Sequence, residues 1–559
     1  MKKFLAVFLA LALCGVLLAG CGETDPYEEP STEGENYAWV DDDAPMLQFG
    51  EPAEEIVAIK TAEGSMSADL RQMIASLKAV VNGKEVRLFT CDLDSDTPIG
   101  WLERLGYTET HNVIVMEDAW EVVDYFKDDV NGLGAVLYDT SNMHSLDVAC
   151  TYAGLNDCLT LSYSIYGELV NRGYDVAVEE DYRGDFADKY EAYEYLYDTL
   201  WDQCTHRILI HFNSAEVGHV RSFGMLVQAA FVYLDVAETR DREIMEKFLA
   251  DMPAGESCIY GWYPAEGRGV ELASRYGVWT YAADYLQSVE FFAHETEIVL
   301  PEYTESFTQR SDVDDGTVYV AMLVSEGDNL QYVENGLYDI CFSSDLLGDF
   351  PVSFSISPTM AVMEPELLNW YYEQANDNIG FTTGPSGVGY TYTSVWEDSD
   401  ALAHFFELTN EYCGIAGIDV VNNWSAVENW ASHPLTDEVR SIMNAECTDI
   451  LTIIDNASTT ATSADGLLIT NMQVGYLQTS DNVTEVFGDA IDLAVAETEH
   501  YGDPSFVWLQ GNPWTRTTMQ DFYDCYNAIK EQYGDKVEFV RADELARAQR
   551  LSCGLPAER

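Results

Sequence analysis

The chain has 559 residues, of which 97 are Asp or Glu and 28 are Lys or Arg, so its formal net charge is −69. Nucleic-acid binding needs a basic surface, which this balance excludes, and long-range repulsion disfavours a polyanionic substrate. Hydrophobic residues make up 47% of the chain, enough for sizeable cores. Aromatic residues make up 12%, which is common among exported carbohydrate-active proteins and also among large extracellular folds with aromatic cores.

The N-terminal sequence is typical of an export signal. Two lysines precede the apolar run 4–18, which is too short to span a membrane, and Leu-Ala-Gly-Cys at 18–21 resembles a lipobox. We expect residues 1–20 to be a lipoprotein signal peptide and Cys21 to carry the lipid, on the extracellular face of a bacterial membrane. Residues 21–50 hold many acids and no Lys or Arg, which predicts an extended, disordered acidic tether.

Strand-like and helix-like segments alternate after the tether, which indicates an α/β fold. We expect an N-terminal α/β subdomain over residues 51–130 and a second α/β region over 131–305. Apolar residues at helical spacing predict one long helix over 222–238. A strand over 258–262 leads into a loop that carries Glu266.

A polar, poorly periodic stretch over 301–315 predicts a domain boundary, so residues 306–559 form the C-terminal domain. Its strand-like segments alternate with helix-length segments at 318–324, 352–356, 379–383, 415–421, 450–454, 467–470, 506–509 and 537–540. Seven or eight β-α repeats predict a (β/α) barrel-like domain. A doubly wound open sheet is the alternative, because a count of strands does not prove closure.

Ligands of parallel barrels bind at the C-terminal ends of the strands, so the residues at these positions are the candidates for a site. Carboxylates, amides and indoles gather there. Those that we expect to act on or bind a ligand are Glu326, Asp328, Asn329, Glu364, Trp424, Asp455, Asn471, Gln510 and Trp514. Amides and acids hydrogen-bond hydroxyl groups and indoles stack on sugar rings, which indicates a carbohydrate ligand.

The loop after the third strand has the sequence Gly-Pro-Ser-Gly-Val-Gly-Tyr-Thr-Tyr-Thr over 384–393. Its glycines allow close approach of the backbone, and its two tyrosines offer flat apolar faces with polar tips. We expect Gly387, Gly389, Tyr390 and Tyr392 to form a binding platform for a ring-shaped ligand. A tight turn with two packed tyrosines is the alternative.

The segment 387–392 resembles the motif that names the GxGYxYP family of bacterial exported proteins, whose proposed activity is glycoside hydrolysis. Thr393 stands where the motif has proline, and the segment 325–329 is similar to the family's Ser-Asp-Gly-Asp-Asn with Glu326 in place of the first Asp. The resemblance extends over nearly all of the chain from about residue 56. It implies a multi-part N-terminal region, a C-terminal barrel-like domain and a carbohydrate-linked role.

Glycoside hydrolysis usually needs two carboxyl groups that flank the scissile bond. Asp328 and Glu326 are the first candidates, and Glu364 and Asp455 are alternative partners. Glu266 reaches the site as a substrate-binding residue if the N-terminal region packs against the barrel. The expected ligand is a neutral oligosaccharide or polysaccharide.

Other chemistries fit less well. Metal-dependent deacetylation needs paired histidines, and the nine histidines include no His-x-x-x-His; the cysteines include no Cys-x-x-Cys, so we expect neither a metal nor another cofactor. The segment 384–388 does not match the Gly-x-Ser-x-Gly of serine hydrolases. A non-catalytic glycan-binding surface lipoprotein remains the rival interpretation from a different class.

Overall fold

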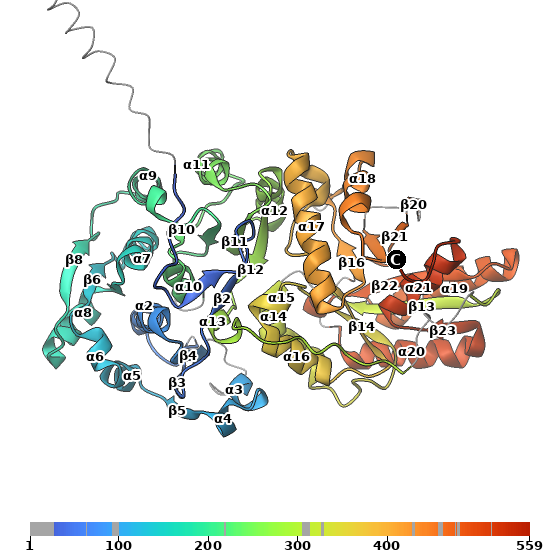
Figure 1. Cartoon of the computed structure of the whole chain (residues 1–559), viewed down its shortest axis with the longest axis horizontal. Coiled ribbons are helices and arrows are strands. Elements are labelled where there is room, and N and C mark those ends of the chain that lie inside the picture. The colour runs from blue at the N-terminus through green and yellow to red at the C-terminus, as the bar shows by residue number, and fades with distance from the viewer. Residues whose placement is uncertain are drawn as a thin grey trace, which may run out of the picture. The chain divides into compact units, whose positions relative to one another are not determined.

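The computed structural model describes residues 27–62, 64–91, 100–216, 220–304, 313–325, 329–427, 431–456, 462–464, 466–475, 477, 481–515 and 517–559. Residues Thr32–Arg559 belong to one unit. In it, small parallel sheets built by the N-terminal half precede a larger set of parallel strands built by the C-terminal half (Figure 1). None of the described helices is both long and apolar enough to cross a membrane.

The tether prediction is wrong for its second half. Strands β1 (Tyr37–Trp39) and β2 (Leu47–Phe49) pair antiparallel, and Met46 and Leu47 are buried. The guanidinium of Arg207 also donates to the carbonyl of Asp41, at 3.1 Å. The high charge masked the apolar residues between the acids, and burial of those residues fixes the segment to the folded unit.

The first sheet has the strand order β4-β3-β5, all parallel, with β3 (Glu55–Lys60) in the centre. Helix α2 (Ala68–Lys84) begins at Ser67, whose hydroxyl accepts from the Leu70 amide and caps the helix. The other elements are β4 (Leu88–Cys91), α3 (Gly100–Arg104), α4 (Tyr107–Thr110), β5 (Asn112–Met116), α5 (Ala119–Tyr125) and α6 (Lys127–Val130).

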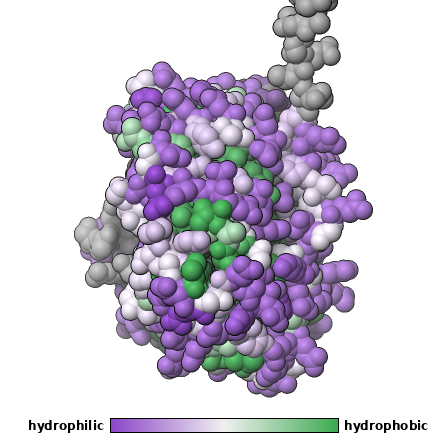
Figure 2. Space-filling view, turned by 90° about the vertical axis from the view of Figure 1, so that its left-hand side faces the viewer, coloured by the Kyte–Doolittle hydropathy of each residue, from purple (hydrophilic) through white to green (hydrophobic). Residues whose placement is uncertain are grey.

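The second sheet has the order β7-β6-β8, again parallel. Its elements are β6 (Gly134–Leu137), α7 (His144–Asn156), β7 (Leu159–Leu161), α8 (Tyr163–Arg172), β8 (Ala177–Asp181) and α9 (Lys189–Thr199). Strand β8 is exposed along its whole length and ends in three acids, which discourages pairing with another chain at this edge. On the face seen from the left-hand side of Figure 1, hydrophilic side chains cover most of the surface, with an apolar patch at the centre and smaller ones above and below it (Figure 2).

The third sheet has the order β10-β9-β11-β12, so the region predicted as one unit over 131–305 contains two separate sheets. Its elements are β9 (Ile208–His211), α10 (Arg221–Leu226), β10 (Ala230–Val232), α11 (Thr239–Asp251), β11 (Ser257–Gly261), α12 (Glu266–Arg275), β12 (Val278–Ala282) and α13 (Val289–Phe292). The long helix predicted over 222–238 is wrong. Gln228 adopts a positive φ of 57° and ends the helical turn, and the apolar run that follows is a buried strand.

The C-terminal half confirms the barrel-like prediction. Its parallel strands are β13 (Val318–Val324), β14 (Val352–Ile356), β15 (Ile379–Thr383), β16 (Val420–Asn423), β19 (Thr452–Asp455), β21 (Leu467–Asn471) and β22 (Ser505–Gly511), and β23 (Val537–Phe539) pairs with the start of β13. Strand β16 begins later than predicted, because Ile415 and Ala416 belong to the end of a helix, and β19 begins at Thr452.

These strands form two ladders, β15-β14-β13-β22 and β16-β19-β21. The ladders meet at two places. The backbone amide of Asn422 in β16 donates to the hydroxyl of Thr383 in β15. Val474, after β21, forms a β-bridge with Leu509 in β22. The strands therefore curl toward a ring whose ladder is interrupted at these two joints.

Helices connect the strands: α14 (Asn329–Glu334), α15 (Met360–Met363), α16 (Pro365–Glu373), α17 (Ser399–Ala416), α18 (Asp437–Glu446), α19 (Val483–Tyr501), α20 (Met519–Tyr533) and α21 (Ala542–Ser552). Helix α21 packs against the concave side of the strands. Gln549 on α21 binds both Trp508 and Thr470, which come from different strands, and Trp508 is fully buried. The concave side is thus filled beneath the C-terminal ends of the strands.

Candidate functional site

The glycine-rich loop after β15 docks on strand β12 of the N-terminal half. Thr280 and Tyr390 exchange two backbone hydrogen bonds of 2.9 Å. This contact requires the glycines. A Cβ on Gly389 would lie 2.1 Å from the Trp279 indole, and Gly387 has a φ of +145° and faces the side chain of Thr409.

The two tyrosines of the motif are fully buried, which corrects the prediction of an open stacking platform. Their hydroxyl oxygens lie 3.1 Å apart. The hydroxyl of Tyr390 donates to the carboxyl group of Glu266 at 3.1 Å. The ring of Tyr390 is covered by Trp262, stacked at 6.1 Å, and by the edge of Trp424 at 5.9 Å. The tyrosines therefore hold a carboxyl group and two indoles in place, and offer no ring face of their own.

Glu266 is the first residue of α12 and stands at the junction of the two halves of the chain. Burial raises the pKa of its carboxyl group to about 7, because a partly desolvated carboxylate is disfavoured, and the hydrogen bond from Tyr390 opposes this rise. A carboxyl group with this pKa is partly protonated at neutral pH. It can donate a proton, which is the property required of a general acid.

A layer of polar groups faces the concave side at the ends of the strands. The Asn422 amide donates to the hydroxyl of Ser325 at 2.9 Å, a bond that joins β16 to the end of β13 across this side. Since side chains alternate along a strand, Gln510 faces the same way as Trp508, whose indole binds α21.

Several polar atoms at this end of the strands have no hydrogen-bond partner: both amide atoms of Gln510, the Oδ1 atom of Asn422 and the indole nitrogen of Trp424. The three side chains are at most 8% exposed. A buried polar group without a partner costs about 1–3 kcal/mol, so a cluster of such groups calls for an explanation, and a hydroxyl-bearing ligand supplies one.

Two predicted residues lie on the opposite face. Asn423, Asp455 and Asn471 are in register on β16, β19 and β21, so their side chains share one face of the sheet. Asn423 accepts from the Thr393 hydroxyl at 2.8 Å and donates to Asp455 at 3.4 Å. Asp455 and Asn471 therefore do not join the layer formed by Asn422 and Gln510.

Glu364 is fully buried, and its two carboxyl oxygens have no hydrogen-bond partner. Burial, together with the nearby charge of Glu334, raises its pKa well above the ordinary value. No hydrogen bond joins its carboxyl group to the other predicted site residues that the structure describes, so its catalytic role stays a prediction. Trp514, just after β22, is 48% exposed and its ring makes an edge-to-face contact with Tyr332, so its role in ligand binding stays a prediction.

Four other predictions lie outside what the structure describes. Glu326 and Asp328 fall in the undescribed segment directly after Ser325, as does the side chain of Asn329, whose backbone begins α14. Cys21 also lies outside the described residues.

Sequence reasoning missed Trp262 and Asn422 as site residues. Asn422 lies two positions before Trp424, and strand alternation was a signal that could have selected both together. Trp262 contacts Tyr390 from a separate sheet, and no spacing within the chain predicts that contact. No group of three His, Cys, Asp or Glu residues suited to a metal occurs in the described part of the chain.

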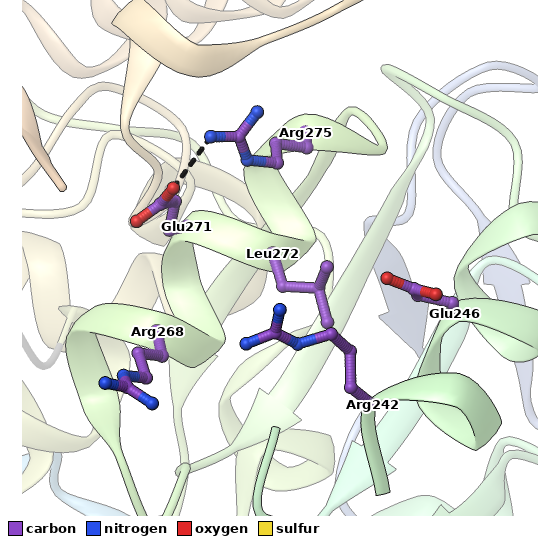
Figure 3. Close-up of a pocket in the computed structure, with 6 residues that line it drawn as sticks. All are labelled: Arg242, Glu246, Arg268, Glu271, Leu272 and Arg275. Carbon is purple, nitrogen blue, oxygen red and sulfur yellow. Dashed lines mark hydrogen bonds and ion pairs between the residues drawn. The ribbon is translucent and has the colours of Figure 1, made fainter. Parts of the chain in front are cut away.

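A separate cavity of about 260 Å³ lies between α11 and α12 (Figure 3). It is lined by Arg242, Glu246, Arg268, Glu271, Leu272 and Arg275. Arg275 is paired with Glu271 at 2.8 Å and with Glu397 at 3.3 Å. The positive and negative charges that line the cavity are close to balanced. The cavity contains none of the residues predicted from the strand ends.

Three family models match the chain. The GxGYxYP putative glycoside hydrolase C-terminal domain matches residues 316–550, the GxGYxYP_N second domain matches 133–204, and the GxGYxYP third domain matches 206–294. None of the curated proteins with which the chain was compared matches it.

Among solved structures, a putative hydrolase from Bacteroides thetaiotaomicron VPI-5482 is similar to the chain, with a TM-score of 0.74 at 18% sequence identity. The match covers 91% of this chain and 96% of that one, and it shows a shared fold. A putative polysaccharide deacetylase from Mycobacterium smegmatis matches with a TM-score of 0.29 at 10% identity, over 47% of this chain and 98% of that one. That score is too low to carry an argument.

Proposed function

The chain belongs to the GxGYxYP family, and from this premise and the geometry around Glu266 we propose that it hydrolyses glycosidic bonds in a neutral oligosaccharide or polysaccharide. One observation carries the proposal. A half-buried carboxyl group with a pKa of about 7 is held by Tyr390 beside two indoles.

Glu266 is the general acid in this proposal. It donates its proton to the glycosidic oxygen as the bond to the anomeric carbon breaks, and the hydroxyl group of the leaving sugar is released. The aromatic surroundings keep the carboxyl group protonated until that moment. Trp262 and Trp424 supply apolar surface against which a sugar ring can pack.

The second carboxyl group is Asp328 or Glu326, which follow Ser325 in the sequence. Support comes from Ser325 itself, since its hydroxyl binds Asn422 of the unpartnered polar layer. A carboxylate here would either attack the anomeric carbon or activate a water molecule. A carboxyl separation of about 5–5.5 Å accompanies retention of configuration, and about 6.5–9.5 Å accompanies inversion.

A second candidate function is capture of glycans without cleavage. The exposed Trp514 and the unpartnered amides would serve a binding protein as well as an enzyme. In either case the sequence of the N-terminus supports export and attachment to the outer face of a bacterial membrane through a lipid on Cys21.

The test is the release of new reducing ends from neutral oligosaccharides by the chain without its signal and lipid. Hydrolysis predicts release by the wild type and a loss of at least about a hundredfold in Glu266→Gln and in one of Asp328→Asn and Glu326→Gln. Glu271→Gln, on the same helix, is the matched control and should retain release. Saturable binding with no release by the wild type would favour capture.

A further inference from the structure

The unpartnered amide of Gln510 says more about the ligand than its general class. Its donor and its acceptor are both without a partner, although only 1% of the residue is exposed. The amide of Gln549, in the same interior, has partners for both of its polar atoms. Gln549 donates to Thr470 at 2.9 Å and accepts from Trp508 at 3.0 Å.

The unmet groups form a mixed set. Gln510 offers a donor and an acceptor, Asn422 an acceptor, and Trp424 a donor. A carboxylate or sulfate accepts hydrogen bonds but cannot donate them, so it would leave the two carbonyl oxygens unmet. A hydroxyl group both donates and accepts, and neighbouring hydroxyls on a sugar ring can meet both ends of one amide.

We infer that Gln510 is a specificity-determining residue that binds two neighbouring hydroxyl groups of a neutral sugar, one as donor and one as acceptor. The inference rests on the proposed function only in that both need a sugar at this site. Gln510 positions and selects the ligand; it takes no part in proton transfer.

The substitution Gln510→Met keeps the length of the side chain and removes both amide atoms. Because those atoms have no protein partner, the variant should bind sugar less well yet be more stable, with Tm raised by about 1–3 °C. Gln549→Met is the matched control. It breaks two hydrogen bonds and should lower Tm. A fall in Tm for Gln510→Met would contradict the inference, because it would show a structural role.

Affinity is measured by calorimetry with the methyl glycosides of glucose, galactose, mannose and xylose, followed by monodeoxy derivatives of the one that binds most tightly. Gln510→Met should weaken binding of the parent glycoside at least about tenfold. One or two deoxy derivatives should bind the wild type weakly and be discriminated no further by the variant. Equal deoxy discrimination in the wild type and the variant, or no saturable binding of any of the four glycosides, would overturn the inference.

Failure of this inference and failure of the proposed function are distinguishable. Binding that depends on Gln510, without release of reducing ends, leaves the inference standing and removes hydrolysis. If Gln510→Met releases reducing ends with the same sugar preference as the wild type, hydrolysis stands and the inference about Gln510 is wrong.

Discussion

The hydroxyl of Tyr390 donates a 3.1 Å hydrogen bond to the carboxyl group of Glu266, and 124 positions of sequence separate the two residues. The bond joins the glycine-rich loop of the C-terminal half to the first turn of α12 in the N-terminal half. The motif thus acts at a distance from its own strand, by fixing a carboxyl group that a helix of the N-terminal half supplies.

Tyr390→Phe should move the alkaline limb of the pH–activity profile upward. Activity is lost as pH rises through about 7, since the acid form of Glu266 is the active form. The phenol hydroxyl opposes the rise in the pKa of Glu266, so its removal raises that pKa further. The limb is read from kcat/KM against pH, and a downward shift would contradict the assigned direction.

Gly389→Ala should destabilise the protein by about 1–3 kcal/mol, because the new Cβ would collide with the indole of Trp279. Gly414→Ala is the control. Gly414 lies within α17 with open space around it, and alanine there should stabilise by about 0.5–1 kcal/mol. Urea denaturation measures both. Equal effects of the two substitutions would refute the close packing of the loop on β12.

Lys78→Met should cost about 3–5 kcal/mol of stability. The Nζ atom of Lys78 in α2 lies 2.9 Å from Glu290 in α13, and both side chains are 1% exposed, so the variant leaves a buried carboxylate without its counter-charge. Lys536→Met, which removes an ion pair to Glu499 with both side chains 58% exposed, should cost less than about 1 kcal/mol. Similar losses of stability in the two variants would show that burial does not decide how much each ion pair stabilises the protein.

Glu364→Gln should make stability less dependent on pH. The pKa of Glu364 is raised by burial and by Glu334, so the folded protein keeps a proton that the unfolded chain loses as pH rises above about 4.5. The contribution of Glu364 to the free energy of unfolding is complete below that pH. It falls as pH rises toward the raised pKa, by at most about 1.4 kcal/mol per pH unit.

The free energy of unfolding of Glu364→Gln minus that of the wild type should therefore be larger at pH 8 than at pH 5.5, as measured by urea denaturation. Glu373→Gln, at an exposed position of α16, serves as the control. If this difference did not change with pH, Glu364 would be charged in the folded protein, which would contradict the raised pKa.

The repeat of buried strands was predictable from the C-terminal sequence, because β13, β14 and β15 are apolar runs of strand length with clear boundaries. The joint between β15 and β16 was not, since it depends on a side-chain hydrogen bond to Thr383. The predicted helix at 222–238 failed because the periodicity of a short apolar run fits a buried strand as well as a helix.

The site also contains residues that the sequence could predict and residues that it could not. Residues at strand ends, such as Gln510 and Trp424, follow from the barrel rule alone. The role of Glu266 does not, because burial raises its pKa and Tyr390 holds its carboxyl group, and only the folded chain brings both about. Asp455 looked equivalent to Gln510 in the sequence, yet its register with Asn423 turns it to the other face.

The central claim is that Glu266 protonates the leaving group, and leaving-group dependence tests it most directly. Activity of Glu266→Ala is compared with the wild type on a 2,4-dinitrophenyl glycoside, whose leaving group needs no proton, and on the matching methyl glycoside or oligosaccharide. We predict that the variant keeps most of its activity on the dinitrophenyl substrate and loses about a hundredfold or more on the other. Equal losses on both substrates, or full activity on both, would contradict the claim.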